Sequence, residues 1–269
     1  MLNILRTIAK HPLGKRAPLT SLVRYVRWQV GSRVLGMPVV VPFVNDGCLV
    51  VEPGMTGATG NIYFGLHEYA DMAFVGHALR EGELFVDIGA NIGNHTLFVL
   101  KFLRAARAIL FEPNPAAITV LRSNLVLNGV EDRCDLSHLG CGLSDSAQEG
   151  LSVHAPRRNL GGGRMVAVEG GTLAVIRGDS VLADQPVDFI KIDVEGMEMR
   201  VLAGLDQTLA RWRPRLFVEV DRKNFGDFRL WLRGTGYAVQ DRFRRYRANE
   251  NFLLVHPQEP PPPGFLPSR

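Results

Sequence analysis

The stretch from Leu84 to Thr96, LFVDIGANIGNHT, constrains the fold of this chain most strongly. It begins as an apolar run that ends in Asp87, passes through Gly89 and Gly93, and continues with helical spacing. Glycines at such a turn let the backbone bend tightly and approach a ligand, and the following helix points its free N–H groups at that ligand. The pattern predicts a strand, a turn and a helix that open a nucleotide-type cofactor site.

The acid at the end of the strand indicates which cofactor is expected. A dinucleotide site has the spacing G-x-G-x-x-G, whereas the order here is Asp87-x-Gly89-x-Asn91-x-Gly93. A carboxylate at that place would repel a pyrophosphate and suits a cationic ligand such as S-adenosylmethionine. Glu112 ends the next short apolar run and can accept hydrogen bonds from both ribose hydroxyls. The plainer alternative is that both acids are solvated carboxylates at strand ends.

Further motifs follow in a characteristic order, and the most distinctive is Ile190-Lys-Ile-Asp-Val-Glu-Gly196. The others are Val86–Gly93, Phe111–Pro115, Asn124–Gly129, Gly142–Asp145, Val201–Gly204 and Pro214–Glu219. Together, over about residues 65–255, they resemble the FkbM family of S-adenosylmethionine-dependent methyltransferases. The resemblance implies an α/β, Rossmann-like fold whose seven-stranded sheet is mostly parallel, with helices on both faces and an antiparallel closing pair. It also implies methyl transfer, usually to a hydroxyl of a sugar, a polyketide or another small molecule.

The expected site has a cofactor side and an acceptor side. The expected cofactor-binding residues are Glu68, Asp87, Gly89, Ala90, Asn91, Gly93, Asn94, Glu112, Pro113, Asn114 and Gly142. Asp193 and Glu195 follow a strand whose carboxyl end lies in the crevice where open α/β sheets bind ligands, so either can remove the hydroxyl proton. Equally, both can simply bond backbone N–H groups of the next helix. A less favoured hypothesis has Asp193 and Glu219 hold a divalent metal, with Glu195 or Asp221 completing the ligands.

Lys191 interrupts a strand that should be apolar on both faces. A buried lysine is costly unless it is paired, and in the usual methyltransferase sheet order its neighbouring strands end near Asp87 and Glu219. We therefore predict an ion pair with one of these two acids, and a structural role for Lys191 is favoured over a catalytic one.

Length and composition suit one catalytic domain. With 269 residues and 46% apolar content, the chain can bury a full-sized α/β core. We expect an N-terminal extension over residues 1–64, a methyltransferase domain over 65–256 and a proline-rich tail over 257–269. Three cysteines without a C-x-x-C pair indicate neither a disulfide framework nor a zinc site, which suits a reducing cytoplasm. No apolar stretch approaches the roughly 20 residues that span a bilayer, and the N-terminus lacks a secretory signal, so a soluble protein is expected.

The N-terminal extension is basic and predicts one amphipathic helix. Its apolar residues recur with helical spacing, opposite Arg24 and Arg27: Leu19, Leu22, Val23, Val26 and Val30. The plain expectation is that this helix packs on the catalytic domain or caps the active site, and weak association with a membrane surface is the alternative. A hairpin is expected over residues 39–52, with its turn at Asn45, Asp46 and Gly47.

Later elements follow from periodicity and from turn residues. Helices are expected over 65–79, 115–128 and 197–210. Strands are expected over 135–143, 187–193 and 216–220, with a closing antiparallel pair at 236–240 and 251–255. The glycine-rich stretch 151–176 predicts an inserted hairpin with a mobile loop at Asn159–Gly163, and the run of prolines after Pro257 predicts an extended or disordered end.

The expected acceptor is a small molecule or a glycan, as in polysaccharide biosynthesis. A rival is an N-methyltransferase of nucleic acid, which the basic run Arg242–Arg247 would suit. It is disfavoured because Asp193-Val-Glu-Gly196 stands where such enzymes carry Asn-Pro-Pro-aromatic. A third possibility is a module that binds the cofactor without turnover.

Overall fold

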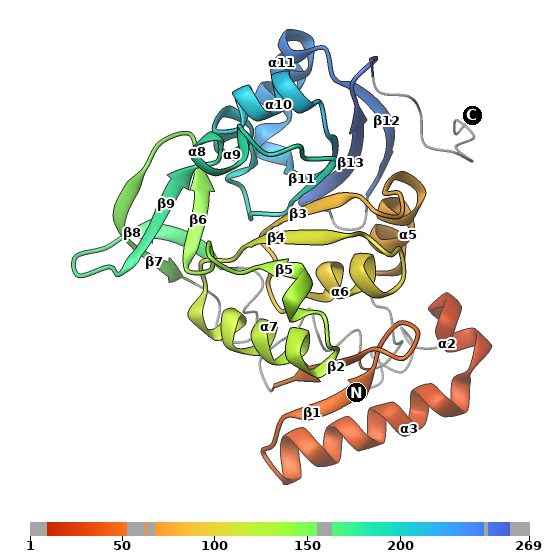
Figure 1. Ribbon diagram of the computed structural model, residues 1–269. Helices are drawn as coiled ribbons and strands as arrows, with labels where there is room; N and C mark the ends of the chain where they lie inside the picture. The colour runs from red at the N-terminus through yellow and green to blue at the C-terminus, as the bar shows by residue number, and fades with distance from the viewer. Residues whose placement is uncertain (1–9, 53–61, 63–67, 155–162, 245–246, 259–269) are drawn as a thin grey trace.

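The computed structural model describes residues 10–52, 62, 68–154, 163–244 and 247–258. A seven-stranded sheet runs through the molecule, with helices on both of its faces (Figure 1). Its strands, in sheet order, are β12 (Ala238–Phe243), β13 (Asn249–Val255), β11 (Arg215–Asp221), β10 (Phe189–Ile192), β3 (Leu84–Ile88), β4 (Arg107–Phe111) and β5 (Cys134–Asp135). From β11 to β5 all neighbours are parallel, whereas β13 runs antiparallel to β11 and to β12. This arrangement confirms the predicted Rossmann-like α/β fold.

Two apolar clusters hold the helices on the sheet, one on each face. Phe85 of β3 points to one cluster and Val86 to the other, as alternation along a strand requires. One face carries α5 (Tyr69–Ala78), α6 (Asn94–Lys101) and α7 (Pro115–Leu127). The other carries α8 (Asp179–Leu182), α9 (Glu198–Ala203), α10 (Asp206–Trp212) and α11 (Phe225–Thr235). The central parallel strands are therefore buried on both sides, which leaves their carboxyl ends as the place for a site.

A second sheet covers one end of the first, and it contains the predicted inserted hairpin. Its order is β6 (Cys141–Ser144), β9 (Leu173–Arg177), β7 (Gln148–His154) and β8 (Arg164–Ala167). The predicted single strand over residues 135–143 is wrong, because it divides between β5 in the large sheet and β6 in the small one. A turn at Gly140, whose φ is +96°, separates the two strands, and its N–H donates to the carbonyl oxygen of Glu112. Residues 159–162 of the predicted mobile loop lie outside the described residues.

The predicted helix over residues 197–210 is also two helices, α9 and α10. They meet at Gly204, where a Cβ atom would clash with the carbonyl oxygen of Ser144 in β6. The chain therefore turns at the point where it crosses the small sheet, which a single straight helix could not do. The catalytic part of the chain also contains two short 3₁₀ turns, η2 (Glu131–Arg133) and η4 (Arg222–Asn224).

The N-terminal extension forms α2 (Pro12–Arg16), α3 (Pro18–Gln29), the π-helical turn η1 (Val30–Val34) and a hairpin of β1 (Val39–Pro42) and β2 (Cys48–Val51). The hairpin is confirmed, with Asn45 in the left-handed region at its turn. It is fixed to α7 by two amides. The Asn124 side chain accepts from the Val50 N–H at 2.7 Å, and Asn128 exchanges hydrogen bonds with the Cys48 backbone at 2.9 and 2.8 Å.

The expected packing face of the N-terminal helix is wrong. Helix α3 buries Ser21, Tyr25 and Trp28, whereas the predicted apolar stripe that starts at Leu19 is exposed. Two aromatic rings on one side of the helix bury more area than the smaller aliphatic side chains on the other. The extension still joins the molecule firmly, because Tyr25 and Trp28 belong to the same apolar cluster as α5 and α6.

The structure also bears on the expectations for the cysteines, the basic run and the C-terminal tail. The three cysteines are free thiols, and no described helix has the length and apolar character needed to cross a membrane. In the basic run from Arg242 to Arg247, Arg242 and Arg244 both pair with Glu250 across the closing strands, at 3.7 and 2.9 Å. The end of the proline-rich tail, from residue 259, lies outside the described residues.

Candidate functional site

A cleft opens at the carboxyl ends of β3, β4 and β10. Seven predicted site residues line it from the turns after β3 and β10 and from the loop after β4: Gly89, Asn91, Glu112, Pro113, Asn114, Asp193 and Glu195. Gly142 of β6, also predicted, lines it as well. Val153 and Met165 of the small sheet close one side, although nothing in their residue types marked them as site residues. The topology thus brings together side chains that are about a hundred positions apart in sequence.

The turn after β3 needs glycine at its first position. Gly89 has a φ of +81°, and a Cβ atom there would clash with the carbonyl oxygen of Asp193 at the end of β10. The N–H groups of Gly89 and Ala90 both donate to the Phe111 carbonyl oxygen, at 2.9 and 3.0 Å, so the turn is also tied to β4. The turn therefore lies in direct contact with both neighbouring strands, with its outer side on the cleft.

Glu112 connects the two loops that form the floor of the cleft. One carboxylate oxygen accepts from the N–H of Asn91 and the other from the N–H of Asn114, each at 2.8 Å. Burial raises the pKa of Glu112, and these two hydrogen bonds oppose the rise. Each oxygen keeps a second lone pair, so the carboxylate can still accept hydrogen bonds from a ligand.

Asp87, which was expected among the cofactor-binding residues, is not one of the residues that line the cleft. Its side chain is wholly buried, and it accepts from the Thr96 hydroxyl at 2.7 Å and from Lys191 Nζ at 3.0 Å. Lys191 also donates to the carbonyl oxygen of Gly89 at 3.0 Å. The predicted ion pair of Lys191 is therefore confirmed with Asp87, and the pair supports the glycine turn from behind.

The charge of Lys191 depends on its carboxylate neighbours. Burial alone would favour a neutral amine, but the negative charges of Asp87 and Asp193 outweigh that effect and raise its pKa. The Asp193 carboxylate is 3.8 Å from Nζ and about one-third exposed. A buried cation thus stands between a buried acid and an acid on the wall of the cleft.

The remaining predicted cofactor residues lie beside or behind the cleft wall. Ala90 is buried, and Gly93 begins α6 with a φ of +83°, where a Cβ atom would approach Leu121 to 2.5 Å. Asn94 is also buried and donates to the carboxylate of Glu68. These residues shape the turn and the start of the helix without lining the cleft themselves.

A cluster of acids stands on the side of the cleft where the acceptor is expected. Asp193 and Glu195 line the cleft, and Glu195 adopts a left-handed conformation, with a φ of +48°, that non-glycine residues rarely take. Behind them, burial and the negative charges of Asp193, Asp71 and Glu195 raise the pKa of Glu219 to about 9. The Asn249 amide donates to Glu219, so the protonated acid is held by β13.

The metal hypothesis gains no support from this geometry. Among the residues that the structure describes, no three His, Cys, Asp or Glu side chains are grouped as a metal site would require.

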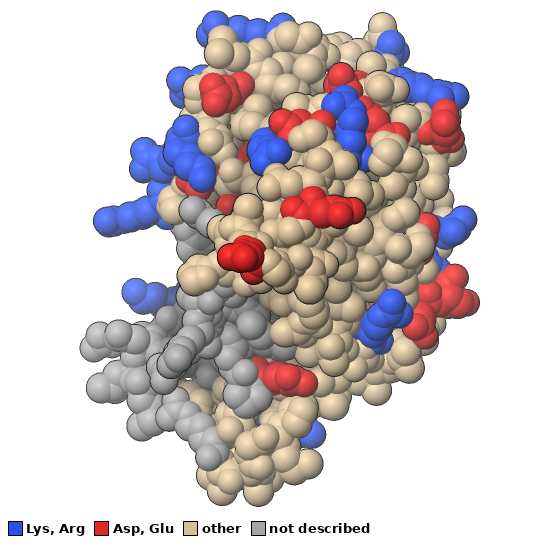
Figure 2. Space-filling view, turned by 90° about the vertical axis from the view of Figure 1, so that its left-hand side faces the viewer, with Lys and Arg blue, Asp and Glu red and all other residues tan. Residues whose placement is uncertain are grey.

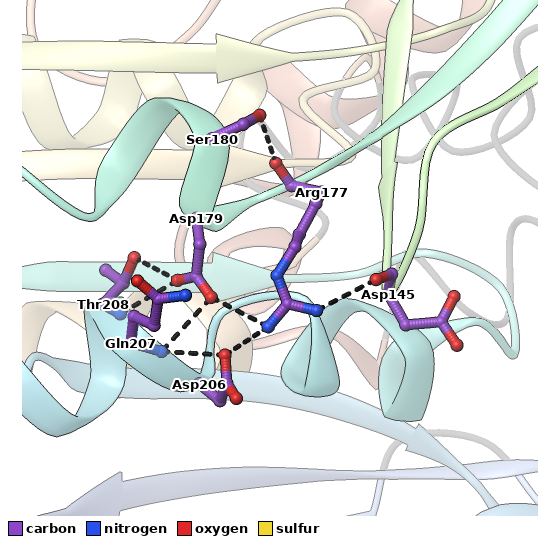
Figure 3. Close-up of polar contacts among 7 residues, drawn as sticks. All are labelled: Asp145, Arg177, Asp179, Ser180, Asp206, Gln207 and Thr208. Atoms are coloured by element: carbon purple, nitrogen blue, oxygen red, sulfur yellow. Dashed lines mark hydrogen bonds and ion pairs between the residues drawn. The ribbon is translucent and has the colours of Figure 1, made fainter.

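A polar network anchors the strand that carries Gly142 into the cleft. The Arg177 guanidinium lies between the Asp145 carbonyl oxygen, 3.0 Å away, and the carboxylates of Asp179 and Asp206 (Figure 3). Asp179 in turn accepts from the N–H and hydroxyl of Thr208, at 2.9 and 2.8 Å, and so caps α10. Sequence reasoning missed this network because its members are ordinary surface residue types without a recurring spacing.

Comparison with known proteins agrees with the geometry. The model of the FkbM methyltransferase domain matches residues 87–239, which is more than half of the chain. The chain belongs to the FkbM methyltransferase family. The matched region contains every strand that borders the cleft, apart from the first residues of β3.

Relatives of this FkbM-family protein differ in how much they share with it. The 31-O-demethyl-FK506 methyltransferase FkbM of Streptomyces tacrolimicus is 29% identical over 213 residues, 64% of this chain and 79% of that one. A tRNA wybutosine-synthesizing protein 2 homolog of Bos taurus is 46% identical over only 80 residues, 30% of this chain and 17% of its own length. A solved protein of Pyrococcus horikoshii, 16% identical, superposes with a TM-score of 0.50 over 88% of this chain and 82% of its own, which shows a shared fold.

Proposed function

We propose that this FkbM-family protein is an S-adenosylmethionine-dependent O-methyltransferase that acts on a hydroxyl of a sugar, a glycan precursor or a related small molecule. The observation that carries the proposal is the charge of the cleft. Its described walls contain three carboxylates, those of Glu112, Asp193 and Glu195, and none of the described lining residues is Lys, Arg or His. A cleft of this charge favours a cationic cofactor and repels a pyrophosphate.

The residues of the cleft fit this cofactor. Glu112 has free lone pairs for the two ribose hydroxyls, and Gly89 and Asn91 bring the backbone to the edge of the cleft. Asp193 and Glu195 supply negative charge to a sulfonium, a role that the sequence pattern assigned to Asp87. Bound there, S-adenosylmethionine supplies an electrophilic methyl group. Binding and alignment by this cleft can contribute roughly 7–11 kcal/mol to the reaction.

We assign removal of the acceptor proton to Asp193. Its carboxylate is about one-third exposed on the cleft wall, and Lys191 fixes it from behind at 3.8 Å. Glu195 stands two residues further along the same turn and orients the acceptor. The protonated Glu219 carries no negative charge at neutral pH, so it does not compete for the proton.

The name of the Streptomyces relative supports transfer to oxygen, because it describes a 31-O-demethyl substrate. The match to a tRNA wybutosine-synthesizing protein supports tRNA as a second candidate substrate, over a much shorter stretch. We favour the hydroxyl of a small molecule, since the relative that supports it shares 64% of this chain rather than 30%. A cytoplasmic location, consistent with the free thiols, belongs to the same proposal.

Calorimetric titration with S-adenosylmethionine and with NAD tests the cofactor. We expect the sulfonium cofactor alone to bind, and Glu112→Ala to weaken its binding at least about 10-fold through loss of charged hydrogen bonds. Glu131→Ala, on an exposed 3₁₀ turn, is the matched control and should bind as the wild type does. Binding of NAD in its place would refute the methyltransferase assignment of the cleft.

The acceptor is tested by release of S-adenosylhomocysteine with a panel of sugars, other hydroxyl compounds and tRNA. On the accepted hydroxyl compound we expect Asp193→Asn to lower kcat about 10²- to 10⁴-fold and also to weaken cofactor binding, because the cleft loses one of its three carboxylates. Asp227→Asn, exposed on α11, should change neither quantity. Turnover with tRNA alone would favour the second candidate. Cofactor binding without turnover on any acceptor would indicate a module without catalysis, and loss of activity on chelation would revive the metal hypothesis.

A further inference from the structure

Helix α3 has two different faces, and its apolar one is directed away from the protein. Ser21, Tyr25 and Trp28 are buried, and the two aromatic residues belong to the apolar cluster that includes the β1–β2 hairpin, α5 and α6. On the other side, Leu19, Val23 and Val26 are 77%, 66% and 52% exposed, and Leu22 and Val30 complete the same helical stripe. Because the buried face already anchors the helix, the exposed stripe is not needed for that packing.

The apolar surface continues beyond the helix. Val34 of η1, Leu35 and Met37 of the following chain, and Val40 of β1 are also exposed. More than half of the exposed large apolar side chains in the described part of the molecule therefore lie between residues 19 and 40. At the height of α3 and the β1–β2 hairpin, the space-filling view shows a lower lobe that is mostly uncharged (Figure 2). Apolar residues scattered singly need no explanation, but such a concentration in one segment marks an interaction surface.

The charge around the patch specifies the partner. Residues 1–45 contain seven Lys and Arg and no Asp or Glu, so this segment carries +7, while the remaining residues carry −3. Lys15, Arg16 and Arg27 are exposed beside the stripe, and Arg24 is half-buried at its edge. A second copy that met this face symmetrically would bring two segments of +7 together, which disfavours a dimer. The fitting partner is anionic and accepts apolar side chains.

We propose that the exposed face of α3, together with its continuation to Val40, lies in the surface of an anionic lipid bilayer. A short helix with an apolar face and flanking cations binds in the plane of the interface, with the apolar side chains among the acyl chains and the cations at the headgroups. Such binding requires no spanning helix. It is also independent of methyl transfer, so it stands or falls separately from the proposed function.

Co-sedimentation of the full chain with vesicles tests the proposal. We expect binding to vesicles of phosphatidylcholine mixed with phosphatidylglycerol, at least about tenfold weaker binding to phosphatidylcholine alone, and release at high salt. Equal binding to both kinds of vesicle, or binding to neither, would overturn the proposal.

Two pairs of variants locate the binding surface. Val23→Ser combined with Val26→Ser should weaken binding roughly tenfold or more, because two apolar side chains leave the interface. Leu230→Ser, whose leucine is 63% exposed on α11, is the matched control and should leave binding unchanged. Arg27→Gln should reduce binding to anionic vesicles, whereas the exposed Arg229→Gln should not.

The variants also serve as their own test of folding and of self-association. All of these changes are at exposed positions, so the melting temperature and cofactor binding should match those of the wild type. Light scattering gives the oligomeric state in solution. A wild-type dimer that becomes a monomer with Val23→Ser and Val26→Ser would assign the patch to a second copy and refute the lipid proposal.

Discussion

The protonation state of Glu219 depends strongly on the groups that surround it. Asp71 faces it from α5, and Asp193 and Glu195 face it from the turn after β10. Burial and these charges raise its pKa from 4.5 to about 9, so the folded protein binds this proton more tightly than the unfolded chain does. The resulting stabilisation is complete below pH 4.5 and is lost as the pH rises through 9.

We therefore expect the free energy of unfolding to fall between pH 4.5 and about 9, by at most about 1.4 kcal/mol per pH unit from this group. Glu219→Gln, which keeps the shape and removes the charge, should flatten this dependence. Glu169→Gln, at an exposed position, should keep the wild-type slope. Urea unfolding at a series of pH values measures both, and an unchanged slope in the Glu219→Gln variant would contradict the assignment.

The pair of Lys191 and Asp87 gives a second prediction at this scale. Both side chains are buried, so Lys191→Met leaves an unpaired carboxylate and should cost about 3–5 kcal/mol in urea unfolding. Combining Lys191→Met with Asp87→Asn should recover part of that loss. The exposed pair of Arg104 and Glu81 is the control, where Glu81→Gln should cost less than about 1 kcal/mol. Equal losses of unfolding free energy in Lys191→Met and Glu81→Gln would show that burial of Lys191 does not determine the cost.

The pair of Lys191 and Asp87 also shows which features of the site can be predicted from the sequence. A lysine in a strand buried on both faces must be paired, and the sheet order restricts its partners, so the sequence predicted an ion pair without deciding between Asp87 and Glu219. The orientation of Asp87 was not predictable in the same way. A motif places an acid at the end of a strand, but only the packed structure decides whether its carboxylate faces the cleft or Lys191.

At the scale of an element, the turn after β3 can be tested against another glycine of nearly the same conformation. Gly89 and Gly82 have φ values of +81° and +83°, but a Cβ atom would meet the Asp193 backbone at Gly89 and open space at Gly82. Gly82→Ala should cost about 1–2 kcal/mol from conformational strain alone. Gly89→Ala should cost more than about 3 kcal/mol and abolish cofactor binding, since the turn must move away from β10. Thermal unfolding measures the losses of stability and calorimetry measures cofactor binding. Similar losses of stability in Gly82→Ala and Gly89→Ala would show that the turn after β3 can shift at little cost.

Elements with a strong periodicity were predicted better than the contacts between them. The hairpin, α7, β10 and the closing strands follow from alternation, helical spacing and turn residues. The division of one predicted strand into β5 and β6 depends on the small sheet, which draws residue 141 and its successors away from β4. The packing face of α3 depends on which of two apolar sides meets the domain, and periodicity alone does not decide between them.

At the scale of the whole molecule, the N-terminal extension and the catalytic domain share one apolar cluster. Trp28 of α3 is 6% exposed within the cluster that also contains residues of α5, α6 and β3. We therefore expect one cooperative unfolding transition rather than early release of the extension. In a Trp212→Phe, Trp231→Phe variant, Trp28 is the sole tryptophan, and its fluorescence should change at the same urea concentration as far-UV circular dichroism. A fluorescence change at lower urea would show that the extension separates first.

The attachment of the hairpin to α7 has a consequence for synthesis of the chain. The backbone groups of Cys48 and Val50 find their amide partners 80 and 74 positions later, so the hairpin leaves the ribosome long before Asn124 and Asn128 do. At ordinary elongation rates of about 5–20 residues per second, this gap lasts roughly 4–16 s. During that interval the backbone groups of Cys48 and Val50 lack their amide partners, and α7 does not yet cover the hairpin. The hairpin is therefore exposed to aggregation early in translation, and completion of α7 reduces that risk.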